Sequence, residues 1–418
     1  MKNFIATLCM LVSSMLVFPS CASNSIRITL KGEVIDRPQS THLILTTEFE
    51  DTRIHGKIMI PIIDGKFEYI LYSEPEKKYM LLFNDEYEQG WMHPVFFFSE
   101  PGIVNFTLFP QNRFIENRVK GGELNTELWN YYHTLYSKIR AIDENRIRYL
   151  EDNYGEILKN LEIPDNDPFW HDVWGRISFL GNAGIEIERF RDSANEAHEQ
   201  ISLWRLQYAK ENPTLVGYAV LHWETSTTIS FNQFIEEGSM TGNPTDISPY
   251  IELYRTVFAP KFPNHTFTEQ MEILLAGRID VGMPFVDFTA PDLNGNPVTL
   301  SERISGRPAI LNLWASWCWP CRRKAIELIP VYEEFRNDGF VVIGVARERE
   351  ISHAIGAINR DRYPWKNLVE LRDVGRIWQK YGLGNSGGAI FLIDENGIIV
   401  ARNPTALEVR MFLAERFR

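Results

Sequence analysis

The feature that most constrains the fold of this chain is a pair of cysteines three residues apart, placed where an apolar run meets a helical pattern. Residues 309–314 form an almost continuous apolar run typical of a buried strand, and residues 321–337 carry apolar side chains at helical spacing. The junction between them holds Trp317, Cys318, Trp319, Pro320 and Cys321. Two thiols at this spacing beside a strand–helix pattern predict a redox-active pair in an α/β domain.

The rest of the C-terminal region, 281–418, continues the alternation of strands and helices. The other expected elements are a Val-rich strand at 340–345, a helix around 374–381, a hairpin of 389–393 and 398–402, and a closing helix from Ala406. Asn396-Gly397 supplies the hairpin turn. A central sheet with helices on both faces follows from this order.

Two further regions are expected ahead of this domain, and a chain of 418 residues is long enough to hold all three. Short alternating strands over 24–120, with Asp64-Gly65 as a hairpin turn, predict an all-β, sandwich-like domain. Residues 121–280 change to helical spacing, with Asn125 or Thr126 as the first cap and a break at 164–168. They predict a helical middle region.

The first residues predict export from the cytosol. Lys2 precedes a mostly apolar run, so residues 1–21 are interpreted as a signal peptide, too short to span a bilayer. Cys21 follows this run and resembles the lipidated cysteine of a lipobox, which predicts a periplasmic lipoprotein anchored in the inner or outer membrane. The alternative is ordinary cleavage after Ala22, which would release a soluble periplasmic protein.

Charge and cysteine usage exclude two classes of function. A formal net charge of −12 argues against nucleic-acid binding, which depends on lysine and arginine. Of the four cysteines, Cys9 and Cys21 fall in the leader, which leaves Cys318 and Cys321 as the side-chain thiols of the mature chain. No second closely spaced ligand pair is available for zinc, so no metal is expected. A purely structural disulfide over so short a loop is the other alternative, and it would stabilise little.

Several motifs in the last third of the chain agree in order and spacing with a known family. They are Val281-Gly282-Met283-Pro284-Phe285, Ala290-Pro291-Asp292, Gly306-Arg307-Pro308, Leu313-Trp314-Ala315-Ser316-Trp317-Cys318 and Phe391-Leu392-Ile393-Asp394. Together they resemble the TlpA-like branch of the thioredoxin superfamily. The region ahead is similar to the β-domain and helical segment that precede thioredoxin modules in exported lipoproteins of gram-negative bacteria. The resemblance implies a thioredoxin fold, protein disulfide or dithiol substrates and a reductant supplied from the membrane, with no cofactor.

Disulfide exchange needs a thiolate, and the residues around Cys318 suggest how one is favoured. Cys318 is expected at a helix N-terminus, where free N–H groups and the helix dipole stabilise an anion, and Pro320 fits the first helical turn. By the resemblance, Trp317 matches the family's tryptophan and Trp319 takes the variable position that tunes potential and partner contact. Residues 322–324 are all cationic: they either stabilise the anion or steer an acidic partner, or form a solvated face with Arg323 pairing Glu327.

The chain departs from the family pattern at two places. The stretch 384–388, Gly-Asn-Ser-Gly-Gly, lacks the cis-proline expected opposite the cysteines, and Gly388 is its expected structural equivalent. Asn312 stands where thioredoxins keep an aspartate, and Lys324 where many TlpA-like proteins keep a glutamate. The nearest carboxylates by sequence, Glu327, Glu348 and Glu350, are each expected at the surface. No buried proton acceptor is assigned.

Three functions compete on this pattern. The leading hypothesis is an exported thiol:disulfide oxidoreductase in which Cys318 attacks and Cys321 resolves a mixed disulfide. The second is a thioredoxin-like binding or scaffold lipoprotein with weak redox turnover, raised by the missing proline and by Lys324. The third is a thiol peroxidase of the peroxiredoxin branch, which the Trp-Cys-Trp-Pro-Cys context does not match.

Overall fold

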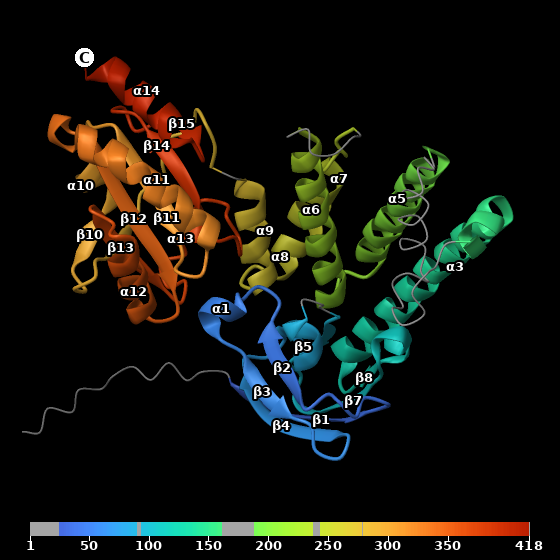
Figure 1. Ribbon diagram of the computed structural model, residues 1–418. Helices are drawn as coiled ribbons and strands as arrows, with labels where there is room; N and C mark the ends of the chain where they lie inside the picture. Colours follow the sequence, from blue (N-terminus) through green and yellow to red (C-terminus); the bar gives the residue numbers. More distant parts are fainter. Residues whose placement is uncertain (1–24, 90–92, 161–187, 237–242, 278, 418) are drawn as a thin grey trace, which may run out of the picture.

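The computed structural model describes residues 25–89, 93–160, 188–236, 243–277 and 279–417. The predicted leader with Cys9 and Cys21, and the expected break at 164–168, lie outside the described residues. Figure 1 shows a sheet domain, a group of long helices and a C-terminal α/β domain, which confirms the predicted fold class. No helix among the described residues is both long enough and apolar enough to cross a membrane.

The N-terminal domain is a sandwich of two four-stranded sheets, ordered β4-β1-β7-β8 and β3-β2-β5-β6. Its strands are β1 (Ile26–Val34), β2 (His42–Thr47), β3 (Ile58–Pro61), β4 (Lys66–Ser73), β5 (Lys78–Phe83), β6 (Val95–Phe98), β7 (Gly102–Leu108) and β8 (Arg118–Lys120). Short helices α1 (Thr52–His55), α2 (Asn84–Glu88) and a 3-10 turn at Gln111–Glu116 connect them. Alternate side chains of both sheets, such as Leu30, Leu45 and Phe106, meet in one core.

The turn at Asp64-Gly65 forms as predicted, but the expected hairpin does not extend beyond it. Ile63 and Lys66 exchange backbone hydrogen bonds of 2.8 and 2.9 Å, and Asp64 and Gly65 both have positive φ. The strands on either side then separate, because β3 pairs with β2 in one sheet and β4 pairs with β1 in the other. The turn therefore links the two layers of the sandwich.

The helical region packs against β6 through a core that includes Phe98, Leu128 and Phe267. Its helices are α3 (Glu123–Asn160), α5 (Glu188–Glu211), α6 (Leu215–Glu236), α7 (Ser248–Leu253), a short π-helix at Tyr254–Phe258, α8 (Ala259–Lys261) and α9 (Thr266–Ala276). The predicted cap at Asn125 or Thr126 is wrong, because α3 begins at Glu123. Asn125 instead bonds both backbone groups of Phe98, at 2.8 and 2.9 Å, and fastens the helix to the sheet.

The C-terminal domain has a five-stranded sheet ordered β13-β12-β11-β14-β15. Its elements are β9 (Thr289–Pro291), β10 (Pro297–Thr299), α10 (Leu300–Ile304), β11 (Ala309–Trp314), α11 (Trp319–Phe335), a 3-10 turn at Arg336–Asp338, β12 (Val341–Glu348), α12 (Ile351–Asp361), β13 (Lys366–Leu371), α13 (Ile377–Lys380), β14 (Ala389–Ile393), β15 (Ile399–Arg402) and α14 (Ala406–Arg416). β11, β12 and β13 run parallel, and β14 is antiparallel to β11. Separate apolar cores cover the two faces of the sheet.

Contacts on two sides hold the C-terminal domain against the rest of the chain. Arg376 forms an ion pair with Glu269 of α9, and α1 of the sheet domain contacts β12. Figure 1 shows α1 at the edge of the sheet domain that faces the C-terminal domain. The end of β12 therefore lies close to a segment that is distant from it in sequence.

Candidate active site at the Cys318–Cys321 disulfide

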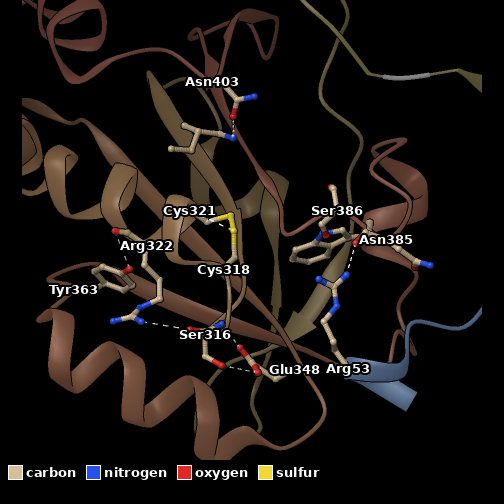
Figure 2. The surroundings of a disulfide bond; sticks show 12 residues. Arg53, Ser316, Cys318, Cys321, Arg322, Glu348, Tyr363, Asn385, Ser386 and Asn403 are labelled. Atoms are coloured by element: carbon tan, nitrogen blue, oxygen red, sulfur yellow. Dashed lines mark hydrogen bonds between the residues drawn. A yellow bond between two sulfur atoms is a disulfide. The ribbon is translucent and has the colours of Figure 1, made fainter. Parts of the chain in front are cut away.

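The two cysteines form a disulfide at the start of α11, with their Cα atoms 5.3 Å apart (Figure 2). Cys318 is the N-cap of the helix, and its Sγ accepts a hydrogen bond from the Cys321 N–H at 3.4 Å. Pro320 lies in the first turn, where its missing N–H costs nothing. Both cysteines are half-buried. This position gives a reduced Cys318 a helix N-terminus and some access to solvent, both of which a nucleophilic thiolate needs.

The two tryptophans beside the disulfide differ in exposure. Trp319 is 60% exposed and is one of the large apolar side chains that the C-terminal domain presents to solvent. Trp317 is half-buried, and the guanidinium of Arg53 lies 3.8 Å from the centre of its ring. Trp319 is therefore free to touch a partner, whereas Trp317 already stacks against the sheet domain.

The cationic residues that follow the motif are largely engaged in ion pairs. Arg322 makes two hydrogen bonds to Asp361, of 2.7 and 2.6 Å, and these hold the pKa of that carboxyl below its usual range. Arg323 lies 3.9 Å from Glu327 on an exposed face, as the second interpretation of this triplet predicted. These contacts give neither arginine a direct role at the sulfur.

The loop 384–388 lies directly on the disulfide. A Cβ at Gly387 would overlap Cys318 Sγ and lie 3.2 Å from Cys321 Sγ. Gly388, the residue expected to face the cysteines, instead has φ +141° and is so close to the end of β11 that a Cβ would overlap the Leu313 carbonyl oxygen. The described residues contain no cis peptide bond. Backbone atoms at Gly387 therefore cover the sulfurs.

Glu348, at the end of β12, is a buried carboxylate beside the loop that carries the cysteines. Only 1% of it is exposed, so the surface expectation is wrong for this residue. It accepts hydrogen bonds from the backbone N–H of Ser316 and from its hydroxyl, the latter at 3.0 Å. Burial raises its pKa, and these bonds only partly offset the rise. Asn312 is also buried, and its side chain has no hydrogen-bond partner among the described residues.

We expect Glu348→Gln to flatten the pH dependence of stability. A carboxyl whose pKa rises on folding holds its proton more tightly in the folded chain. The stability that Glu348 contributes is therefore fully present below the ordinary glutamate pKa of about 4.3, and it is lost as the pH rises through the raised pKa. Urea unfolding between pH 4 and 8 should show a smaller decline in the variant than in wild type.

The matched control for this measurement is Glu327→Gln, because Glu327 is exposed. Its unfolding midpoints should follow the wild-type curve at every pH. Glu370 is buried and also has a raised pKa, so a residual slope is expected to persist in Glu348→Gln. A Glu348→Gln curve with the full wild-type slope would contradict the buried position of this carboxyl.

Two residues at the site, Arg53 and Arg347, have no counterpart in the sequence analysis, and Gly387 entered it only as part of the stretch 384–388. Arg347 follows the Val-rich run and is fully buried, so the charged pair Arg347-Glu348 at the end of an apolar strand was a usable signal. Arg53 donates a 2.6 Å hydrogen bond to the carbonyl of Asn385, 332 residues further along the chain. No local sequence pattern indicates such a contact.

Comparisons with known proteins match this same domain. Residues 281–402 match the model of the AhpC/TSA family. The chain is 27% identical over 120 residues to the thiol:disulfide interchange protein DsbE of Pseudomonas fluorescens biotype C, covering 28% of this chain and 64% of DsbE. It is 25% identical over 123 residues to the thiol-disulfide oxidoreductase ResA of Bacillus thuringiensis, covering 29% of this chain and 69% of ResA. The chain thus spans less than two thirds of the DsbE relative.

Solved structures match over a similar length. The thioredoxin domain of a thiol-disulfide oxidoreductase from Bacteroides vulgatus is 25% identical, with a TM-score of 0.31 and coverage of 33% of this chain and 98% of that chain. A thiol:disulfide interchange protein from Bacteroides sp. is 25% identical, with a TM-score of 0.30 and coverage of 33% and 90%. The sequence relatives carry the comparison: residues 281–402 lie in a thioredoxin-like domain that is similar to the thiol:disulfide oxidoreductases DsbE and ResA.

Proposed function

We propose that the whole protein is an exported thiol:disulfide oxidoreductase that exchanges its Cys318–Cys321 pair with protein substrates. The observation that carries this proposal is the half-buried Cys318 at the N-terminus of α11, already joined to Cys321. Unpaired N–H groups and the helix dipole favour negative charge at this sulfur, which is the charge that a nucleophilic thiol must bear.

The exchange follows from the two positions. In the reducing direction, the Cys318 thiolate attacks one sulfur of a substrate disulfide and releases the other as a thiolate. Cys321 then attacks Cys318 in the mixed disulfide, which releases the second substrate thiol and leaves the protein oxidised. Two electrons pass to the substrate. Oxidation of a substrate dithiol is the same sequence in reverse.

The setting of this activity is also part of the proposal. The leader pattern at 1–21 supports work in the periplasm, and Cys21 would carry a lipid anchor to the inner or outer membrane. A reductant supplied from the membrane would return the oxidised pair to the dithiol. Fatty-acid labelling of wild type but not of Cys21→Ala would separate this anchor from ordinary cleavage after Ala22.

The experiment that tests the proposal is covalent capture with Cys321→Ser in periplasm. Without the resolving thiol, the mixed disulfide on Cys318 cannot be released internally and should accumulate with substrate proteins. Non-reducing gels should show reductant-sensitive adducts, and mass spectrometry would identify the partners. An absence of adducts, or steady consumption of hydrogen peroxide by the wild-type protein, would contradict the proposed exchange reaction.

A further inference from the structure

The loop that lies on the disulfide is held in place by side chains from outside the loop. Trp378 Nε1 donates to the Ser386 carbonyl at 3.1 Å, Arg347 to the Gly384 carbonyl at 3.3 Å, and Arg53 to the Asn385 carbonyl at 2.6 Å. Three of the five loop residues are glycines, which have the largest backbone freedom to lose. The shape of this loop therefore depends on the groups that bind its carbonyls.

One of those groups belongs to the sheet domain. Arg53 lies in α1, between β2 and β3, and Figure 2 shows its guanidinium reaching the loop beside the disulfide. The guanidinium contacts the face of Trp317 at 3.8 Å and the carbonyl of Asn385. Arg53 thus bridges the segment immediately before Cys318 and the loop that covers it.

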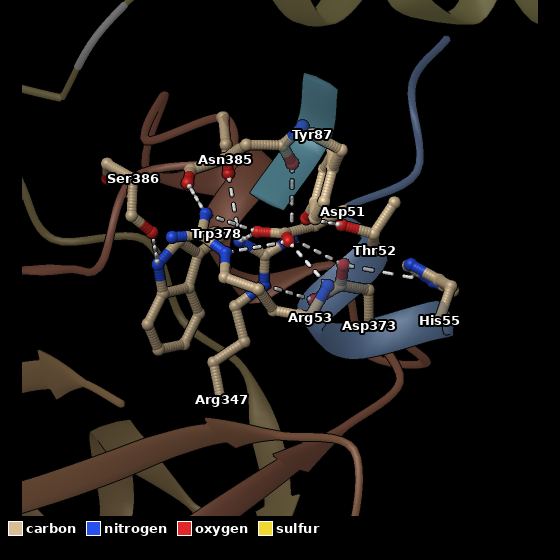
Figure 3. Close-up of polar contacts among 11 residues, drawn as sticks. Asp51, Thr52, Arg53, His55, Tyr87, Arg347, Asp373, Trp378, Asn385 and Ser386 are labelled. Carbon is tan, nitrogen blue, oxygen red and sulfur yellow. Dashed lines mark hydrogen bonds and ion pairs between the residues drawn. The ribbon is translucent and has the colours of Figure 1, made fainter. Parts of the chain in front are cut away.

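A buried ionic network fixes the direction of Arg53 (Figure 3). Asp51 accepts two hydrogen bonds from the Arg53 guanidinium, of 2.8 and 2.7 Å, and lies 3.5 Å from Arg347. Arg347, which is fully buried, makes paired hydrogen bonds of 2.7 and 2.5 Å to Asp373. The sheet domain contributes one carboxylate and one guanidinium, and the C-terminal domain contributes the same. Each carboxylate is thus paired within its own domain, and two contacts link the pairs across the domains: Asp51 with Arg347, and His55 Nε2 with Asp373 at 3.9 Å.

The Asp51 carboxylate of this network is ionised at neutral pH. Burial would raise the pKa of Asp51, but hydrogen bonds from Arg53 and the charge of Arg347 outweigh it and hold that pKa below its ordinary value. The carboxylate is therefore ionised wherever the cysteines are active. Asp51 thus remains an anionic partner for both Arg53 and Arg347.

We propose that Arg53 is a positioning residue of the disulfide site, through which the sheet domain completes the surface that docks a substrate polypeptide beside Cys318. This inference rests on the proposed exchange function. The loop 384–388 lacks the ring of a proline to set its backbone, and hydrogen bonds from Trp378, Arg347 and Arg53 hold it instead, the last of them from another domain. Arg53 acts on the substrate through Trp317 and the loop, without touching the sulfurs.

The test compares Arg53→Ala with wild type in the full-length mature chain. With a peptide that contains one disulfide as substrate, we expect KM to rise about tenfold, equivalent to about 1.4 kcal/mol of binding. The rate of Cys318 alkylation by iodoacetamide in the reduced protein should stay within about twofold, because the helix N-terminus that favours its thiolate is unchanged. A general loss of structure would alter both quantities together.

Two variants serve as controls for this measurement. Arg53→Lys keeps a cation and a donor and should recover part of the lost affinity, which a merely space-filling role would not produce. Arg27→Ala removes an exposed arginine from β1 of the same domain and should leave KM unchanged. Amide hydrogen exchange at 384–388 should be faster in Arg53→Ala and unchanged in Arg27→Ala.

The outcomes separate this inference from the function on which it rests. If wild type does not reduce the peptide, the proposed function fails. If wild type turns over and Arg53→Ala has the same KM and the same exchange at 384–388, the positioning role is overturned while the function stands. Should Arg53→Ala not fold, Arg53→Lys carries the same test, with an intermediate KM expected and a wild-type KM and wild-type loop exchange counting against the proposal.

Discussion

Replacing Cys318 with serine should reduce disulfide exchange to the rate of the added reductant alone. A serine hydroxyl at the N-terminus of α11 remains protonated at neutral pH, whereas a cysteine there has a thiolate fraction that the helix increases. The loss should be complete because the other cysteine among the described residues, Cys321, is assigned the resolving step and not the attack. Turnover of insulin disulfides with dithiothreitol as the reductant measures it directly.

Cys321→Ser is the matched control, because it removes the same atom one helical turn away. It should lose turnover as well but keep the first step, so adducts form on Cys318 and persist. The Cys321 N–H that donates to Cys318 Sγ is a backbone group and survives the substitution. If Cys318→Ser instead retained capture, Cys321 would be the attacking thiol and the assigned roles would be reversed.

The architecture of the C-terminal domain could be predicted because its signals are local. The apolar runs that become β11 and β14 and the Asn396-Gly397 turn each specify a short segment without help from distant residues. The order of these segments then allows few arrangements, since parallel strands need crossover helices. The same reasoning predicted an all-β, sandwich-like N-terminal domain but paired β3 and β4 wrongly, because a turn fixes only the residues beside it.

The parts of the site that the sequence did not indicate depend on contacts between residues that are far apart in the sequence. β12 extends beyond its apolar run to include Arg347 and Glu348, whose charges are satisfied by Asp373 and by Ser316. Glutamate is usually found at the protein surface, and only the assembled fold shows the partners of this buried one. Arg53 is the extreme case, since its role depends on a sheet domain docking beside a loop 332 residues away.

Gly387 and Gly388, at the end of the loop, show what a motif comparison can and cannot determine. The missing proline was evident from the sequence, and alignment on the following strand assigned its place to Gly388. In the structure, a Cβ added at Gly388 would point toward Leu313, whereas a Cβ added at Gly387 would point toward the sulfurs. A difference of one residue in register decides which backbone atoms face the chemistry, and spacing alone does not resolve it.

Gly387→Ala should slow disulfide exchange at least about tenfold and destabilise the oxidised protein by about 1–3 kcal/mol, the usual cost of overpacking. The added methyl would overlap Cys318 Sγ and lie 2.9 Å from Cys318 Cβ, so the loop must move off the disulfide. The φ angle of Gly387 is not positive, so an alanine there is disfavoured by the lack of space and not by its backbone conformation. Peptide reduction and urea unfolding measure the two effects.

Substitutions at two other glycines distinguish a local effect on the disulfide from a general loss of stability. Gly356→Ala, in α12 with open space around the added Cβ, should leave exchange unchanged and stabilise the helix by up to about 1 kcal/mol. Gly388→Ala combines φ +141° with an overlap on the Leu313 carbonyl, so it should destabilise the fold more than Gly387→Ala. Because its added methyl points away from the sulfurs, any slowing of exchange at Gly388 should follow the loss of folded protein. In Gly387→Ala, the slowing of exchange should be larger than its own loss of folded protein explains. A Gly387→Ala enzyme as fast as wild type would mean that the loop does not cover Cys318.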